Sequence, residues 1–252
     1  MANQYILSTN LSSLDLFINI IVPICALIFA YLLGSISISV ILGKLYFHQD
    51  PRQFGSKNPG GTNSGRLWGK KIGVLVMIAD MIKASLAFWI TYIVIKNTQL
   101  DLILVHDSQM VALWITPLGS VLGHCYSCFL KFKGGKGVST MVGSLGTSSL
   151  LQLGFGVFSF FVPLLSKKYV SLSSICLSIG SIIISWSIYI ASIVGDPAIA
   201  NSLLIPNGML EVHIIYPLVC TTISLIVIIR HKANIKRLLN HSESQVGFLV
   251  KK

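Results

Sequence analysis

Acidic residues are scarce in this sequence of 252 residues, which contains 8 Asp and Glu against 19 Lys and Arg. They are scattered, so no segment supplies the clustered carboxylates that Mg²⁺ prefers as ligands. The 5 Cys all lie in apolar runs, and the one CxxC pair, Cys125 and Cys128, has no second pair and no suitably spaced His. We therefore expect no metal site and no cofactor, and we interpret the cysteines as small apolar side chains.

Charge of either sign is also rare. Only 11% of the residues are charged and the mean hydropathy is +0.77, whereas a soluble domain has about 25% charged residues. An apolar run needs about 20 residues to cross a bilayer. Runs of this kind occupy residues 16–41, 72–95, 110–130, 170–194 and 210–229. The sequence therefore predicts an all-α membrane protein rather than a soluble domain.

Basic residues predict the orientation, because they are enriched in cytoplasmic loops. Residues 1–15 and 97–109 contain no Lys or Arg, whereas 44–71, 131–136 and the tail from 230 are basic. A single crossing within 137–166 would place Lys167, Lys168 and the basic tail outside. We therefore expect two short or broken helices, or a re-entrant pair, in that stretch. The prediction is about seven transmembrane helices in one domain, 1–252, with the N-terminus outside and a short polar cytoplasmic tail at 240–252.

The first of three polar groups on the cytoplasmic side is GSKNPGGTNSGR, residues 55–66. Its glycines and proline exclude a regular helix through most of the stretch. Glycines also let backbone N–H groups converge on an anion. A solvated basic loop is the alternative interpretation. The candidate phosphate ligands are neutral donors and one planar guanidinium, namely Ser56, Asn58, Thr62, Asn63 and Arg66.

The second polar group is KFKGGKG, residues 131–137, which leads into an apolar helix. A helix N-terminus with free N–H groups attracts anions. The stretch matches neither GxxxxGK[ST] nor GxGxxG, and a simple interfacial turn is the alternative. The candidate residues are Gly134, Gly135, Lys136 and Gly137.

The third polar group is RHKANIKRLL, residues 230–239, which we expect to continue the last span without a break. His231 and Asn234 are three residues apart and therefore share one helix face. Histidine titrates near neutral pH, so it can transfer a proton or bind an anion. A juxtamembrane basic helix lying on anionic lipid is the alternative.

Further polar residues lie inside the spans. Asp80 and Lys83 are three residues apart in the second span, and we interpret them as a structural ion pair, although intramembrane charge often indicates function. His124 lies beside the second group and is either a ligand or a core histidine. Together these features predict a metal-free phosphate pocket at the membrane surface, where one substrate can be a lipid.

The three groups in this order resemble the acyl-phosphate-dependent glycerol-3-phosphate acyltransferases of bacterial membranes, the PlsY family. The resemblance covers nearly the whole chain, with YLLGS in the first span and DMIK in the second. The family is seven-spanning with cytoplasmic motifs. The resemblance implies transfer of a fatty acyl group from acyl phosphate to glycerol 3-phosphate, giving 1-acyl-glycerol 3-phosphate and phosphate, the first step of phospholipid synthesis.

The resemblance also implies a cellular location and a set of partners. The chain would lie in the bacterial cell membrane with its active site facing the cytoplasm. Its partners would be the two substrates, the lipid bilayer and an enzyme that produces acyl phosphate, with no nucleic acid.

Matching the motifs residue by residue assigns roles. Ser56 and Arg66 match the first-motif serine and arginine, and Gly134 to Gly137 match the glycerol-phosphate loop. The third-motif His and Asn fall on His231 and Asn234, and its later glutamate on Glu243, to which we give a structural role. His231 is either the general base or a phosphate ligand. The departures from the family pattern are Lys57, where glycine is common, together with Ala84, Ser127 and His241.

Other function classes fit less well. A membrane transporter for a phosphorylated anionic solute is the main alternative, but the basic groups cluster on one face rather than at the midplane. Metal-dependent phosphatidyltransferases need several aspartates in a short window, which the sequence lacks. Acyltransferases that use CoA or a carrier protein have HxxxxD, and no His here has an acid five positions later.

Overall fold

A computed structural model describes residues 12–196, 201–203 and 211–246, and all regular elements in these ranges are helices. Residues 1–11 of the predicted outer segment and 247–252 of the predicted tail lie outside this description. Five segments within it are long and apolar enough to cross a membrane, namely Ser13–Leu45, Lys70–Asn97, His106–Leu130, Leu150–Lys167 and Val170–Val194. The all-α membrane architecture predicted from the sequence is thus confirmed.

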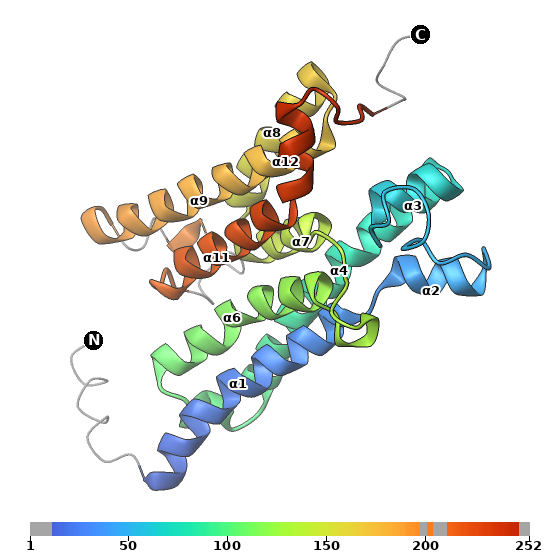
Figure 1. The fold of residues 1–252 in the computed structure, drawn as a ribbon. Coiled ribbons are helices and arrows are strands. Elements are labelled where there is room, and N and C mark those ends of the chain that lie inside the picture. Colours follow the sequence, from blue (N-terminus) through green and yellow to red (C-terminus); the bar gives the residue numbers. More distant parts are fainter. Residues whose placement is uncertain (1–11, 197–200, 204–210, 247–252) are drawn as a thin grey trace.

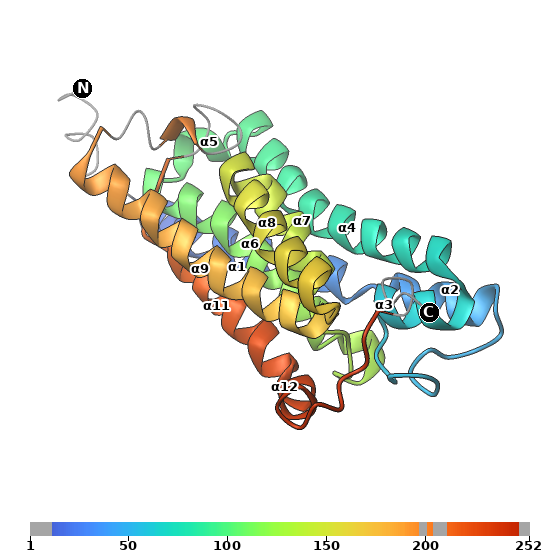
Figure 2. The same cartoon turned by 90° about the horizontal axis from the view of Figure 1, so that it is seen from above.

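The main helices pack one on the next so that the contacts close into a ring. The order around the ring is α1 (Ser13–Ser35), α6 (His106–Cys125), α11 (Ile215–Arg230), α9 (Val170–Val194), α8 (Leu150–Lys167), α7 (Val138–Ser148) and α4 (Lys70–Asn97), which returns to α1. The shorter elements are α2 (Ile38–Leu45), α3 (Gly61–Trp68), α5 (Leu100–Ile103), the 3-10 turn η2 (Cys128–Leu130) and α12 (Lys232–Leu239). Helices α2 and α3 project from one end of the bundle (Figures 1 and 2).

Small residues bring α1 and α6 into backbone contact. A Cβ atom at Gly123 would lie 2.1 Å from the carbonyl oxygen of Tyr31, and one at Gly34 would lie 2.3 Å from that of Ser120. Gly119 and Gly123 are four residues apart, so they share one face of α6. Helices in lipid gain no hydrophobic free energy by associating and depend on close packing of small residues instead.

The stretch 137–166 forms a helical hairpin. Helix α7 has 11 residues and meets α8 at Ser149. A Cβ atom at Gly156 would lie 2.9 Å from Leu145, so the two helices fold back on each other. Figure 2 shows the pair between α4 and α9. At about 1.5 Å per residue, α7 is shorter than the hydrocarbon layer, which confirms the prediction of a short helix here.

The hairpin turn keeps its polar groups bonded. The Ser149 hydroxyl accepts a hydrogen bond from the N–H of Gln152 at 3.3 Å and donates one to the carbonyl of Leu203. On the other side, α7 lies directly on α4, because a Cβ atom at Gly143 would lie 2.2 Å from the carbonyl oxygen of Met81. A short helix end inside a membrane is tolerated where protein covers it in this way.

Two local predictions are wrong. The second half of the first polar group is helical, because α3 begins at Gly61 directly after Gly60. Its glycines serve helix packing rather than a loop, since a Cβ atom at Gly73 of α4 would lie 2.7 Å from the Cα of Gly65.

The last span does not continue straight into the third polar group. Helices α11 and α12 meet at His231 with a bend of 58°. The N–H of His231 bonds to the carbonyl of Ile228 at 2.9 Å, which tightens the last turn, and its ring approaches the carbonyl oxygen of Val227 at 2.7 Å. A side chain that inserts into the helical hydrogen-bond ladder is a known cause of sharp bends.

The α1–α6 contact generates a stability prediction. Replacing Gly123 by Ala forces a methyl group against the backbone of α1, an overpacking change that costs about 1–3 kcal/mol. We expect the thermal unfolding midpoint of the detergent-purified protein to fall. The matched control is Gly154→Ala in α8, where nothing lies within 4 Å of the new Cβ atom. A Gly123→Ala midpoint at or above that of the control would contradict the packing argument.

Candidate active site

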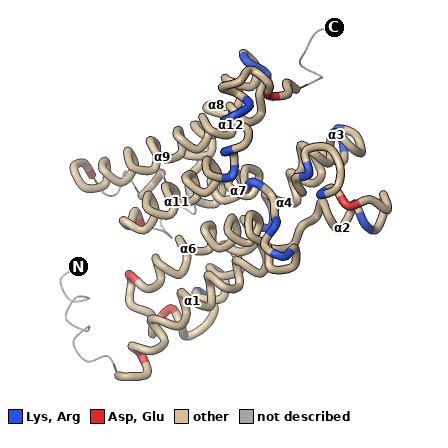
Figure 3. Tube along the Cα trace, viewed as in Figure 1, with Lys and Arg blue, Asp and Glu red and all other residues tan. Residues whose placement is uncertain are grey.

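Basic residues gather at one end of the bundle. Figure 3 shows Lys and Arg around α2, α3, α12 and the connection between α6 and α7. The three polar groups predicted from the sequence all lie at this end, although long stretches of chain separate them. The fold therefore brings together the segments that the charge pattern singled out.

These segments enclose a cavity of about 480 Å³. Six cations and one carboxylate are among the residues that line it. The lining comprises Asp50, Arg52, Gln53, Ser56, Lys57, Asn58, Phe132, Lys133, Gly134, Lys136, Arg230, Ala233, Asn234 and Arg237. All three polar groups contribute to this wall, and its charge suits an anionic ligand.

The second and third groups are joined by a chain of hydrogen bonds. The ammonium of Lys136 donates to Oδ1 of Asn234 at 2.7 Å, and Nδ2 of Asn234 donates to Glu243 at 2.6 Å. The same carboxylate accepts from Nε of Arg237 at 2.6 Å. Asn234 thus links Lys136 of the glycine loop to Glu243, which follows α12, through one hydrogen bond to each.

This network perturbs both of its ionisable ends. Burial, with further contributions from Arg237 and Arg66, lowers the pKa of Lys136 to about 8, and the attraction of Glu243 opposes the shift. Burial opposes ionisation of Glu243 as well, but the hydrogen bonds from Asn234 and Arg237 outweigh it and lower the pKa of this carboxyl group. Strongly shifted groups are typical of functional sites.

His231 is buried at the bend between α11 and α12. Its Nδ1 lies 2.7 Å from the carbonyl oxygen of Val227. A carbonyl oxygen can only accept, so this contact assigns the proton of a neutral ring to Nδ1 and leaves Nε2 with a free lone pair. His231 therefore has the tautomer that a general base or a hydrogen-bond acceptor requires.

Some residues of the first polar group line the cavity, and others hold the loop in place behind it. Ser56 and Asn58 line the cavity. Asn63 is buried instead, where its carboxamide accepts from the backbone N–H of Ser56 at 2.9 Å and donates to the carbonyls of Pro51 and Phe54. Asn63 thus fixes the loop that presents Ser56.

Several predicted residues lie off the cavity wall, among them His231, which is 2% exposed at the bend. Arg66 is exposed on α3, with its guanidinium 3.4 Å from the hydroxyl of Ser244, while it still lowers the pKa of Lys136. Thr62 is exposed on the same helix. Gly137 caps α7 with φ +83°, a conformation that favours glycine.

Sequence reasoning missed Arg230. Its Nε donates to the carbonyl of Gly135 at 3.0 Å and its Nη2 to that of Gly134 at 2.9 Å, so it holds the glycine loop from one side. Its guanidinium also lies over the ring of Tyr126, 5.4 Å from the centroid. The spacing offered a signal, because Arg230 is four residues before Asn234 and Arg237 three after it.

Lys57 has an unusual backbone. Its φ is +56°, a left-handed conformation that costs a non-glycine residue about 1–2 kcal/mol. The residue lies on the cavity wall, to which it contributes one of the six cations. This chain thus accepts local strain at Lys57, a position where the resemblance led us to expect glycine.

Known proteins match this chain over most of its length. Residues 24–241 match the family model described as glycerol-3-phosphate acyltransferase. A glycerol-3-phosphate acyltransferase of Syntrophotalea carbinolica is 40% identical over 222 residues, covering 87% of this chain and 95% of the relative. Glycerol-3-phosphate acyltransferase 2 of Lactobacillus johnsonii is 37% identical, covering 88% and 86%.

The architecture also matches a solved structure. Crystal structures of PlsY, an integral membrane glycerol 3-phosphate acyltransferase, superpose with TM-scores of 0.67 for the glycerol 3-phosphate form and 0.66 for the lysophosphatidic acid form. Both are 32% identical in sequence and cover 90% of this chain and 96% of the solved one. This chain therefore belongs to the family of integral membrane glycerol-3-phosphate acyltransferases.

Proposed function

We propose that the protein transfers a fatty acyl group from acyl phosphate to glycerol 3-phosphate. The products are 1-acyl-glycerol 3-phosphate and inorganic phosphate. The observation that carries the proposal is the cavity formed by all three polar groups, with six cations and one carboxylate on its wall. Both substrates are phosphate anions, so the charge of this cavity suits them.

The chemistry needs positioning more than activation. Acyl phosphate is a mixed anhydride with a good leaving group. The 1-hydroxyl of glycerol 3-phosphate attacks the acyl carbon, an ester C–O bond forms, and the C–O bond to phosphate breaks. Fixed donors and cations bring the two anions together, a role that we give to Ser56, Asn58, Arg66 and Lys136. The N–H groups of Gly134 and Gly135 are engaged by Cys125 and His124, so these glycines shape the loop that presents Lys136.

The hydroxyl proton needs an acceptor. His231 can accept the proton, because its Nδ1 proton faces the carbonyl of Val227 and the lone pair of the neutral ring is therefore on Nε2. A phosphate oxygen of a substrate is the other route, in which His231 binds phosphate instead. Asn234 either orients a substrate oxygen or holds Lys136, to which it is bonded.

The proposal includes a place in the cell. The basic end of the bundle faces the cytoplasm of a bacterial cell, because basic residues are retained on that side of the membrane. The whole chain acts as one membrane domain. Acyl phosphate reaches it from an enzyme that makes this activated lipid.

The decisive assay uses purified protein in detergent with both substrates and a chelator of divalent metals. We expect release of phosphate together with formation of 1-acyl-glycerol 3-phosphate. If the protein were a transporter for a phosphorylated solute, proteoliposomes would show anion flux without any chemical change, and the proposal would be wrong. The end-on position of the cavity argues against a transporter, whose site lies near the midplane.

Arg66 and His231 generate a paired mutational prediction. Arg66→Ala and His231→Ala should each lower turnover about a hundredfold or more, because removing a fixed charge donor or an acid-base group costs that much. Phosphate release is measured at saturating substrate, with the thermal midpoint as a check on folding. Lys96→Ala is the control, since Lys96 pairs with Asp101 away from the cavity. Near-normal turnover in either variant removes that residue from the mechanism.

Lys136 generates a pH prediction. With a pKa of about 8, its ammonium is charged below that pH and becomes neutral above it. The KM for glycerol 3-phosphate should therefore rise as the pH increases through this value. In Lys136→Arg the rise should be shallower, because a guanidinium stays protonated. Identical KM profiles for the two proteins would contradict this role for Lys136.

A further inference from the structure

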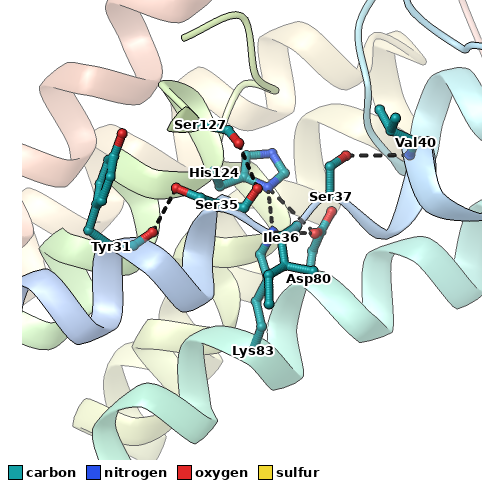
Figure 4. Close-up of polar contacts among 9 residues, drawn as sticks. All are labelled: Tyr31, Ser35, Ile36, Ser37, Val40, Asp80, Lys83, His124 and Ser127. Atoms are coloured by element: carbon teal, nitrogen blue, oxygen red, sulfur yellow. Dashed lines mark hydrogen bonds and ion pairs between the residues drawn. The ribbon is translucent and has the colours of Figure 1, made fainter. Parts of the chain in front are cut away.

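A cluster of charged side chains lies inside the bundle, beside the glycine loop. Asp80 and Lys83 of α4 and His124 of α6 are 2%, 6% and 8% exposed. The ammonium of Lys83 lies 2.8 Å from Asp80 and 3.1 Å from Nδ1 of His124 (Figure 4). A buried ion pair stabilises a protein no more than apolar residues of similar volume do. Stability alone therefore does not account for the cluster.

Lys83 uses all three of its donors. The third goes to the carbonyl oxygen of Ile36 at 2.9 Å. An ammonium group can only donate, so Nδ1 of His124 accepts in this contact, which is shorter than the 3.5 Å between the same atom and Asp80. The three acceptors come from α4, from α6 and from the junction of α1 with α2. One ammonium group thus ties three segments together.

The junction at Ile36 leads toward the first polar group. Ile36 ends α1, and the Ser37 side chain caps α2 by accepting from the N–H of Val40 at 3.4 Å (Figure 4). The hydroxyl of Ser127, just after α6, donates to the carbonyl of Ser35 at 2.6 Å. The end of α6 is therefore bonded to this junction directly through Ser127 and indirectly through Lys83.

His124 supports the glycine loop directly. Its carbonyl oxygen accepts from the N–H of Gly135 at 2.9 Å, and the carbonyl of Cys125 accepts from that of Gly134. The ring packs against the loop as well, because a Cβ atom at Gly135 would lie 2.1 Å from Nε2 of His124. Arg230 bonds to the loop carbonyls. The loop that carries Lys136 is thus held by His124 and Arg230.

We infer that Lys83, held by Asp80, fixes the ring of His124 and thereby positions the Gly134–Lys136 loop for binding the phosphate of glycerol 3-phosphate. The inference rests on the proposed function and extends it to residues outside the cavity wall. These three are positioning residues, because their contacts are with one another, with the junction of α1 and α2 and with the glycine loop. An apolar side chain at position 83 would remove the donor to Ile36 and leave the ring with only its 3.5 Å contact to Asp80.

A matched pair of substitutions at His124 tests the bond to Lys83. Asn and Leu have similar shapes, and both remove the ring from beneath Gly135, but only Asn offers an oxygen to the ammonium. Both variants should raise the KM for glycerol 3-phosphate, because both lack the ring, but His124→Leu should raise it about tenfold more than His124→Asn, the worth of a charge-assisted hydrogen bond that only Asn can still accept. Turnover number should change little. Equal KM values for the two variants would overturn the inference.

A second test removes the ammonium itself. Lys83→Met alone leaves Asp80 buried without its partner, so the neutral double variant Asp80→Leu/Lys83→Met is measured beside it. We expect the double variant to fold and to show a KM raised about tenfold, while Lys96→Met near the other end of α4 leaves the KM unchanged. A purely structural role would lower the thermal midpoint and leave the KM as in the wild type, which would contradict positioning.

Calorimetric binding of glycerol 3-phosphate separates the two proposals. A wild-type protein without turnover would refute the proposed reaction, yet its dissociation constant, compared with those of the His124 variants, would still report on loop position. A wild-type protein that does not bind glycerol 3-phosphate would overturn the positioning inference too, because the loop would have no phosphate to hold.

Discussion

Mutual repulsion among cations in a confined space is the constraint on which this site depends. Six basic side chains line one cavity at the end of a membrane bundle, and like charges repel more strongly near low-dielectric surroundings than in water. The protein offsets this repulsion with acceptors that it supplies itself. Asp50 pairs with Arg52 at 2.6 Å, the carbonyls of Gly134 and Gly135 accept from Arg230, and Glu243 accepts from Arg237. The same acceptors also fix the positions of the cations. The hydrogen bonds that reduce the repulsion therefore also determine the shape of the site.

Much of this arrangement could be predicted from the sequence, because a membrane leaves few alternatives. Spans must be helical to satisfy their backbone groups, so apolar runs indicate helices. Lys167 and the basic tail can both lie on the cytoplasmic side only if residues 137–166 form two membrane segments. Two segments in so short a stretch predict a short helix, and α7 is that helix. Lys136 and Asn234 were candidates for one site because phosphate chemistry needs cations and donors, and they are in direct contact.

What could not be predicted depends on three-dimensional contacts. Glycine is ambiguous, because it serves loops and close helix packing equally, and only the contact of Gly65 with Gly73 shows which applies. The carboxamide of Asn63 could have faced a ligand, yet the nearby backbone engages it. At the bend, the ring of His231 bonds to the carbonyl of Val227. The spacing of apolar residues in the sequence does not predict such a bond. Arg230 was partly predictable, since its spacing from Asn234 follows the helix, but its bonds to the loop follow from tertiary structure alone.

Glu243 is a counter-ion for the cations beside the cavity. Its carboxylate already bonds to Asn234 and Arg237 and attracts Lys136. A phosphate that binds here would compete with the Glu243 carboxylate for the same cations. Its net affinity would be the attraction of the cations for phosphate minus their attraction for Glu243. In the proposed reaction the same exchange would run in reverse when inorganic phosphate leaves, because the carboxylate would again balance the cations. A counter-ion of this kind would weaken the binding of each anion and so favour its release.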